Sequence, residues 1–209
     1  QVTRMPAAPP VIKLLATHPL VDRFDLSSLR LIGSGGSRLE SSDRLACLRR
    51  WEDKGWGPLS IKEGFGMTEL APVLCINPES MVKPGSVGVL VPNVCVCVVD
   101  IESGERLPPG QSGEIWVRGP NQMSGYAGID TGGIDTDGWF HTGDIGYFDQ
   151  DGCYFITDRL KELIKYKGYQ VAPAELERVL LGIPGIVEAC VVGVPDPGCG
   201  EIPKAYVVT

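Results

Sequence analysis

The feature that most constrains the fold of this sequence is a series of turn-forming pairs between Lys83 and Phe155. Short apolar runs lie between them. The pairs are Pro84-Gly85, Ser103-Gly104, Pro109-Gly110, Ser112-Gly113, Gly132-Gly133 and Asp151-Gly152. Apolar runs separated by turn-forming pairs are typical of short strands joined by tight turns. We therefore expect strands at 94–100, 113–118 and 152–156. The spacing predicts a small, mainly antiparallel β subdomain.

An α/β layer is predicted before these strands. A brief apolar run at 29–32 leads into the glycine turn 33–37. A helix is expected at 40–51, with Leu45 and Leu48 on its apolar face. Strand, glycine turn and helix in this order indicate an α/β layer.

The section from Leu160 onward predicts an α+β unit. Residues 163–166 and 169–171 are expected to form a hairpin around Lys167-Gly168, although a helical face is an open alternative there. Pro173 is expected to begin a helix that ends by Gly182. Its inward residues would be Leu176, Val179 and Leu180. Strands are expected at 186–194 and 205–209, with a loop at 195–200.

The predicted fold class is therefore α/β with a mainly antiparallel β subdomain, followed by the start of a small α+β lid. The expected boundaries give an α/β part at 1–84, a β-barrel-like part at 85–158 and a hinge with the start of the lid at 159–209. The chain begins at Gln1 and ends within the strand-like YVVT, so we expect it to be a fragment of a longer protein.

Composition excludes some classes of function. The 209 residues are 43% hydrophobic and carry a formal net charge of -7, which argues against nucleic acid as a partner. No apolar run reaches the length of a transmembrane helix. Seven cysteines without a CxxC pair predict neither a zinc site nor a disulfide framework, and Cys95 and Cys97 are expected to be core residues. A reducing, intracellular compartment fits this pattern.

A basic segment lies in this acidic chain. Arg159, Lys161, Lys165 and Lys167 follow one another closely within 137–170. They indicate either an anionic ligand or simply a solvated basic turn.

Residues 63–69, EGFGMTE, carry a second candidate site. The glycines flanking Phe65 allow a tight bend that would lay its ring against a purine. Thr68 offers a hydroxyl to a phosphate, and Glu69 offers a carboxylate to Mg²⁺, which prefers oxygen ligands. The alternative is a structural turn with a surface glutamate.

Two further motifs are also candidate binding sites. The turn at 34–39 exposes backbone N–H groups before a helix, which suits an anion or an aromatic ring, although a plain βα turn has the same pattern. Asp144, in the string WFHTGD, could accept both hydroxyls of a ribose. The neighbouring His141 is more typical of a structural residue than of a catalyst.

Together, these strings resemble the adenylate-forming (AMP-binding) enzymes, in the branch of acyl-CoA synthetases, 4-coumarate–CoA ligases and luciferases. The resemblance implies catalytic roles for Thr68, Glu69, Lys161 and Lys165. It implies that Glu69 binds the metal and that Lys167 and Gly168 line the path of CoA. It implies nucleotide binding by Gly36, Ser37, Glu63, Gly64, Phe65, Thr68, Asp144, Arg159, Lys165 and Gln170.

The sequence departs from the family pattern at a few positions. Ser37 and Arg38 stand where relatives usually have alanine and proline, and Glu63 stands where they often have glutamine. The loop 127–135 is shorter than usual. These departures indicate a divergent member.

The resemblance implies an ATP-dependent carboxylate–CoA ligase, with a carboxylic acid, ATP, Mg²⁺ and CoA as its small molecules. Alternatives are adenylation for another acceptor, as in luciferases or carrier-protein loading, and a non-catalytic nucleotide-binding fragment. The family's phosphate loop and late lid lysine are missing from these residues, so we expect no turnover by this stretch alone. The acid and the oligomeric state stay open, although the string at 67–72 slightly favours an acyl chain. Localisation is expected to be cytoplasmic or peroxisomal.

Overall fold

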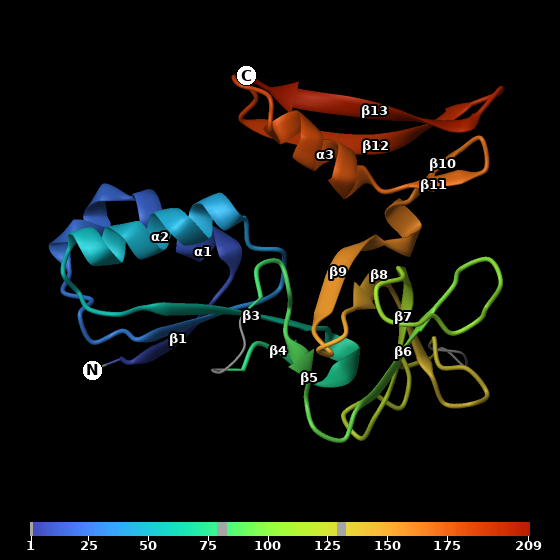
Figure 1. The fold of residues 1–209 in the computed structure, drawn as a ribbon, viewed down its shortest axis with the longest axis horizontal. Coiled ribbons are helices and arrows are strands. Elements are labelled where there is room, and N and C mark those ends of the chain that lie inside the picture. The colour runs from blue at the N-terminus through green and yellow to red at the C-terminus, as the bar shows by residue number, and fades with distance from the viewer. Residues whose placement is uncertain (1, 79–82, 129–132) are drawn as a thin grey trace. The chain divides into compact units, whose positions relative to one another are not determined.

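A computed structural model describes residues 2–78, 83–128 and 133–209 (Figure 1). The chain divides into two compact units, which are described separately. Unit 1 comprises Gln1–Cys95, Arg118–Gly132 and Asp149–Phe155. Unit 2 comprises Val96–Val117, Gly133–Phe148 and Ile156–Thr209. Gly132 of the expected turn Gly132-Gly133 and part of the loop 127–135 lie outside the described residues.

Unit 1 is built on a five-stranded sheet in the order β1-β2-β3-β4-β5. Its strands are β1 (Arg4–Ala7), β2 (Leu31–Ser34), β3 (Ser60–Gly66), β4 (Val73–Ile76) and β5 (Val89–Leu90). The first three are parallel, and β4 and β5 continue the sheet antiparallel. The predicted order of strand, glycine turn and helix is confirmed, but the strand begins and ends two residues later than the apolar run 29–32 and includes the first two residues of the expected turn.

Helices α1 (Pro9–Thr17) and α2 (Ser41–Asp53) cover one face of the parallel strands (Figure 1). The core between them is apolar and contains Ile12, Ile32, Cys47, Trp51 and Ile61. The expected inner face of α2 was wrong in part. Leu48 packs against the core, but Leu45 is 52% exposed.

Most of the second sheet belongs to unit 2. Its order is β6-β7-β8-β9, with β6 (Cys95–Val99), β7 (Gly113–Arg118), β8 (Phe140–Phe148) and β9 (Tyr154–Arg159). The strands predicted at 94–100 and 113–118 are confirmed, and the third lies at β9, shifted along the chain. The nine-residue β8 was not predicted. Cys95 is exposed, so its expected place in the core was wrong.

The third sheet lies wholly in unit 2 and has the order β11-β10-β13-β12. A 3₁₀ turn, η3 (Leu160–Glu162), precedes β10 (Ile164–Tyr166), β11 (Tyr169–Val171), α3 (Pro173–Leu181), β12 (Glu188–Asp196) and β13 (Gly200–Val208). Neighbouring strands are antiparallel, and α3 packs against β12 (Figure 1).

The hairpin predicted around Lys167-Gly168 is confirmed. Both residues have positive φ, +48° and +85°, which is the backbone of a tight two-residue turn. Two other expectations for this section were wrong. Val179 is 63% exposed rather than inward, and β12 and β13 extend into the expected loop, leaving only 197–199 between them.

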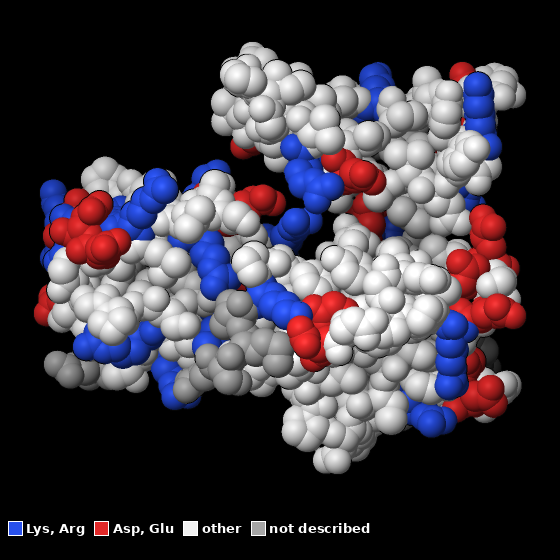
Figure 2. All heavy atoms as spheres, in the orientation of Figure 1, with Lys and Arg blue, Asp and Glu red and all other residues white. Residues whose placement is uncertain are grey.

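Within the described residues, no helix combines the length and apolar character needed to cross a membrane. Within the described residues, none of the seven cysteines is part of a disulfide. On the face drawn in Figure 2, lysine and arginine side chains are interspersed with aspartate and glutamate. The described residues on that face therefore form no broad basic surface.

Candidate functional site

The predicted site residues of unit 1 gather at the carboxyl ends of two adjacent parallel strands. In the register of β2 and β3, Ser34 lies opposite Glu63. The turn after β2 therefore lies beside the motif that ends β3, and a Cβ placed on Gly35 would lie 3.7 Å from the carbonyl oxygen of Gly64. Gly36 and Ser37 are exposed at this edge. The carboxyl edge of parallel strands is the usual place for a ligand in α/β layers.

The Glu63 carboxylate links this edge to the helix α2. It lies 3.3 Å from Nη1 of Arg44 and accepts a hydrogen bond from the backbone of Leu39. Burial raises the pKa of Glu63 above its ordinary value, and the guanidinium of Arg44 partly opposes that rise. In this conformation the carboxylate holds the glycine turn against the start of the helix.

Glycine is required where β3 meets β4. A Cβ on Gly66 would lie 1.8 Å from the carbonyl oxygen of Pro72, and one on Gly64 would lie 3.0 Å from that of Cys75. The half-buried Phe65 stands between the two glycines. The glycines thus let the two strands approach closely while the aromatic ring stays at the edge.

A short turn then displays the next two motif residues. The 3₁₀ turn η2 (Thr68–Leu70) is closed by a 2.7 Å hydrogen bond from the N–H of Met67 to the carbonyl of Pro72. Leu70 is fully buried and anchors the turn, whereas Thr68 is exposed. Anchoring through leucine fixes the direction in which Thr68 and Glu69 are presented.

The segment 121–126 clamps this turn. The hydroxyl of Tyr126 donates to Oε1 of Glu69, and the N–H of Met123 donates to the Glu69 carbonyl over 2.8 Å. The amide of Asn121 donates to the carbonyls of Leu70 and Val73. The hydrogen bond to Glu69 raises the pKa of Tyr126 above its ordinary value. Sequence reasoning missed these three clamp residues because they lie far from the motif in the chain, with 57 positions between Tyr126 and Glu69.

The oxygen atoms at this turn suit a hard divalent cation. The Glu69 carboxylate and the neighbouring Thr68 hydroxyl are the donor type that Mg²⁺ prefers. Among the described residues there is no group of three or more His, Cys, Asp or Glu side chains that could hold a metal ion. Mg²⁺ bound through one carboxylate plus water and phosphate oxygens fits this donor set.

In unit 2, Asp144 lies in a bulge of β8. Trp116 pairs with His141 and Glu114 with Ile145, so residues 142–144 lie opposite a single residue of β7. Asp144 is only 3% exposed. A buried carboxylate at a bulge is a typical arrangement for a re-aimed functional side chain.

Arg159, the last residue of β9, provides a positive charge beside Asp144. Its Nε lies 3.2 Å from Oδ1 of Asp144, and the arginine side chain is about half exposed. The preceding Asp158 accepts the N–H of Arg159 at 2.7 Å and that of Ala174 at 3.3 Å. Asp158 therefore ties the end of β9 to the first turn of α3, where a negative charge is stabilising.

The side chain of His141 packs against neighbouring residues. Its ring stacks on Trp116 with centroids 3.9 Å apart, and Nε2 lies 3.3 Å from Oδ2 of Asp135. These contacts give the histidine a structural place beside the bulge.

The remaining predicted residues lie on the hairpin and in η3. Lys165 and Gln170 are directly opposite each other on β10 and β11, and Lys167 and Gly168 form the tip. All four are exposed, as is Lys161 in η3. The structure thus brings Lys165 and Gln170 together and places the CoA-binding candidates Lys167 and Gly168 at the tip of the same hairpin.

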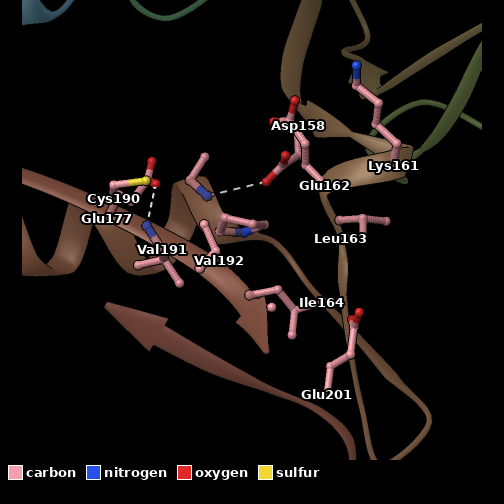
Figure 3. Close-up of a pocket in the computed structure, with 13 residues that line it drawn as sticks. Asp158, Lys161, Glu162, Leu163, Ile164, Glu177, Cys190, Val191, Val192 and Glu201 are labelled. Atoms are coloured by element: carbon pink, nitrogen blue, oxygen red, sulfur yellow. Dashed lines mark hydrogen bonds between the residues drawn. The ribbon is translucent and has the colours of Figure 1, made fainter. Parts of the chain in front are cut away.

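A separate cavity of about 430 Å³ opens in unit 2 (Figure 3). Its polar lining is mainly acidic, with Asp158, Glu162, Glu177 and Glu201, and Lys161 is the one predicted site residue on its wall. Oε1 of Glu177 accepts the N–H of Val191 at 2.8 Å. Because carboxylates repel phosphate groups, this cavity does not suit a nucleotide.

Comparison with family models matches two parts of the chain. Residues 1–127 match the model described as AMP-binding enzyme. Residues 175–209 match the model described as AMP-binding enzyme C-terminal domain.

Similar proteins include ligases and a monooxygenase. The chain is 47% identical over 203 residues to "Probable 4-coumarate--CoA ligase 2" of Dictyostelium discoideum, and 47% identical over 203 residues to "Luciferin 4-monooxygenase" of Photinus pyralis. Each match covers 96% of this chain and 36% of the relative, so the chain spans about a third of their length. Among solved structures, ATP-bound MatB from Rhodopseudomonas palustris is similar with a TM-score of 0.83 at 32% identity, covering 99% of this chain and 41% of that one.

Proposed function

Because the chain belongs to the AMP-binding enzyme family, we propose that the complete protein activates a carboxylic acid as an acyl adenylate and transfers the acyl group to coenzyme A. One observation carries the proposal. The glycine turn after β2 and the motif from Phe65 to Glu69 lie at the same carboxyl edge of unit 1. That edge offers an aromatic face, a hydroxyl and a carboxylate together, as an adenylate with its metal ion requires.

The first step forms a bond between a carboxylate oxygen of the acid and the α-phosphorus of ATP. The bond from that phosphorus to the bridging oxygen breaks, and pyrophosphate leaves. In the second step, the thiol of CoA loses its proton to solvent and its sulfur bonds to the acyl carbon, and AMP leaves with the electrons of the carbon–oxygen bond. Adenylation is needed because a free carboxylate is a poor acyl donor.

Residues of unit 1 would bind the nucleotide during the first step. Gly36, Ser37 and Gly64 offer backbone surface to the adenine, and the ring of Phe65 packs against it. The hydroxyl of Thr68 donates to a phosphate oxygen. A Mg²⁺ ion held by Glu69 would neutralise phosphate charge. Glu63 would act indirectly, because its carboxylate holds the glycine turn in place through its contacts with Leu39 and Arg44.

Residues of unit 2 would hold the sugar and serve the second step. Asp144 accepts hydrogen bonds from the ribose hydroxyls, and Arg159 contributes positive charge toward the ribose or phosphate. Lys165 and Gln170, paired across the hairpin, would contact the adenylate or the acyl carbonyl. Lys167 and Gly168 would guide the pantetheine chain, and Lys161 would lie at the pivot of the lid.

A second acceptor class is favoured by one observation. The sequence identity to a luciferin monooxygenase, 47%, equals the identity to a 4-coumarate–CoA ligase. Adenylation followed by a different second step is therefore our second candidate. The boundaries near 84 and 158, the intracellular location and the lack of turnover by this stretch alone stay predictions.

The test is pyrophosphate release by the complete protein, across hydroxycinnamic, medium-chain and long-chain acids, with and without CoA. We expect release with one acid class and a thioester only when CoA is present. Release without thioester would favour the second candidate. No release with any acid would overturn the adenylation proposal. The variants Glu69→Ala and Asp144→Ala should lose most activity, whereas the exposed control Glu102→Ala should not.

A further inference from the structure

The bulge that carries Asp144 is held by a small set of hydrogen bonds. Thr142 donates through its hydroxyl to the carbonyl of Ile115 at 2.7 Å and accepts the N–H of Asp144 at 3.0 Å. Gly143, with φ of +70°, completes the bulge in the left-handed region. The backbone conformation at 142–144 thus depends on partners in the facing strand β7.

Glu114 of β7 supplies a side-chain partner for the N–H of Gly143. Oε1 of Glu114 accepts that N–H at 3.0 Å, while Oε2 accepts Nε1–H of Trp116 at 2.7 Å. Both oxygens of one half-buried carboxylate are therefore engaged by N–H donors. Charge-assisted hydrogen bonds of this kind are stronger than neutral ones.

The indole of Trp116 is itself fixed. It stacks on His141 across the strand pair with ring planes 16° apart, and His141 lies near Asp135. A chain of contacts therefore runs from Asp135 through His141 and Trp116 to Glu114. It ends at Gly143, the residue immediately before Asp144.

We propose that Glu114 is a positioning residue for nucleotide recognition, acting by fixing the Gly143 peptide so that the Asp144 carboxylate is aimed at the ribose. The inference rests on the proposed role of Asp144. A carboxylate is needed because its two partners are both donors. Glutamine has a single acceptor oxygen, so its NH₂ group must face either the Gly143 N–H or the Trp116 N–H.

The test is Glu114→Gln in the complete protein, with the exposed Glu102→Gln as the matched control. We expect the KM for ATP to rise about tenfold, with kcat reduced much less. We also expect the preference for ATP over 2′-deoxyATP and 3′-deoxyATP to fall about threefold or more, because a misaligned carboxylate no longer reads both hydroxyls.

A merely structural role would lower the unfolding midpoint without changing the preference among these nucleotides. That outcome would overturn the inference while leaving the proposed function intact. Absence of pyrophosphate release by the wild-type protein would overturn both.

A second substitution tests the same geometry in a way that a general loss of stability cannot mimic. Trp116→Phe removes the donor that faces Oε2 and keeps an aromatic ring to stack on His141. In the double variant Glu114→Gln/Trp116→Phe, the glutamine oxygen can face the N–H of Gly143 while its NH₂ group meets no donor. We expect the double variant to recover ATP preference relative to Glu114→Gln, a non-additive result. Additive effects of the two substitutions would contradict the proposal.

Discussion

The guanidinium of Arg159 lies 3.2 Å from the carboxylate of Asp144, joining the end of β9 to the bulge of β8. The carboxylate is buried, whereas the arginine is half exposed. An ion pair of this kind leaves the arginine side chain able to turn toward a bound anion while its backbone stays in place. The pair links the residue expected to hold the ribose with the start of the basic segment.

Replacing Arg159 with glutamine should lower kcat/KM for pyrophosphate release about tenfold or more, because the charged partner that we propose for the nucleotide is lost. Steady-state kinetics at varied ATP would measure this. The matched control is Arg178→Gln, an exposed arginine in the last turn of α3. Equal kinetics for the two variants would contradict a nucleotide role for Arg159.

Replacing Tyr126 with phenylalanine should raise the Mg²⁺ concentration needed for half-maximal activity about threefold, because the Glu69 carboxylate loses a donor that orients it. Tyr206→Phe is the control, since that exposed ring lies under Lys204 and phenylalanine keeps the ring. The readouts are Mg²⁺ titrations of activity and of nucleotide binding. An unchanged Mg²⁺ requirement would show that Tyr126 does not orient the carboxylate.

The same contact predicts a pH dependence at the alkaline end. The pKa of Tyr126 is raised by its hydrogen bond to Glu69, so the phenol holds its proton more tightly in the folded protein. The stability that this hydrogen bond contributes to the folded protein is fully present below the ordinary tyrosine pKa, about 10. It is lost as the pH rises through the pKa of Tyr126 in the folded protein. The difference in unfolding midpoint between wild type and Tyr126→Phe should therefore shrink in that range.

Sequence patterns predicted the local features of this chain well. The Lys167-Gly168 hairpin follows from two residues that accept a tight turn between short apolar runs. The glycine turn after β2 follows from the run 33–37. Each of these signals lies within a few residues, so neither depends on knowing what packs against it.

Features that depend on distant partners could not be predicted in the same way. Strand β8 was missed because its bulge at 142–144 breaks the alternation that marks a strand. Glu114 lies 29 positions from Gly143, and no local pattern joins them. On α2, helical periodicity allowed a face containing Leu45. The sheet instead meets the face of Cys47 and Trp51, a choice that only tertiary packing makes.

Replacing Glu63 with glutamine should flatten the pH dependence of stability. Burial raises the pKa of Glu63, so the folded state binds a proton more readily than the unfolded chain. The stability contributed by that proton is present below the ordinary glutamate pKa, about 4.3, and is lost as pH rises through the folded value. Thermal unfolding from pH 4 to 7 would compare wild type, Glu63→Gln and the exposed control Glu40→Gln. A wild-type profile parallel to that of Glu63→Gln would contradict the assignment.

Replacing Gly168 with alanine should separate the two half-reactions. Its φ of +85° strains any residue with a Cβ, so the tip of the hairpin should shift where we propose that pantetheine passes. We expect ATP–pyrophosphate exchange to stay near the wild-type rate, because the residues that we propose for adenylation lie outside the tip, while thioester formation falls about tenfold. Gly198→Ala is the control, because that glycine has an ordinary φ and an added Cβ meets only Asp196 at 3.5 Å. Parallel loss of both half-reactions in Gly168→Ala would instead assign the hairpin tip to adenylation or to folding, and the proposed CoA path along Lys167 and Gly168 would be wrong.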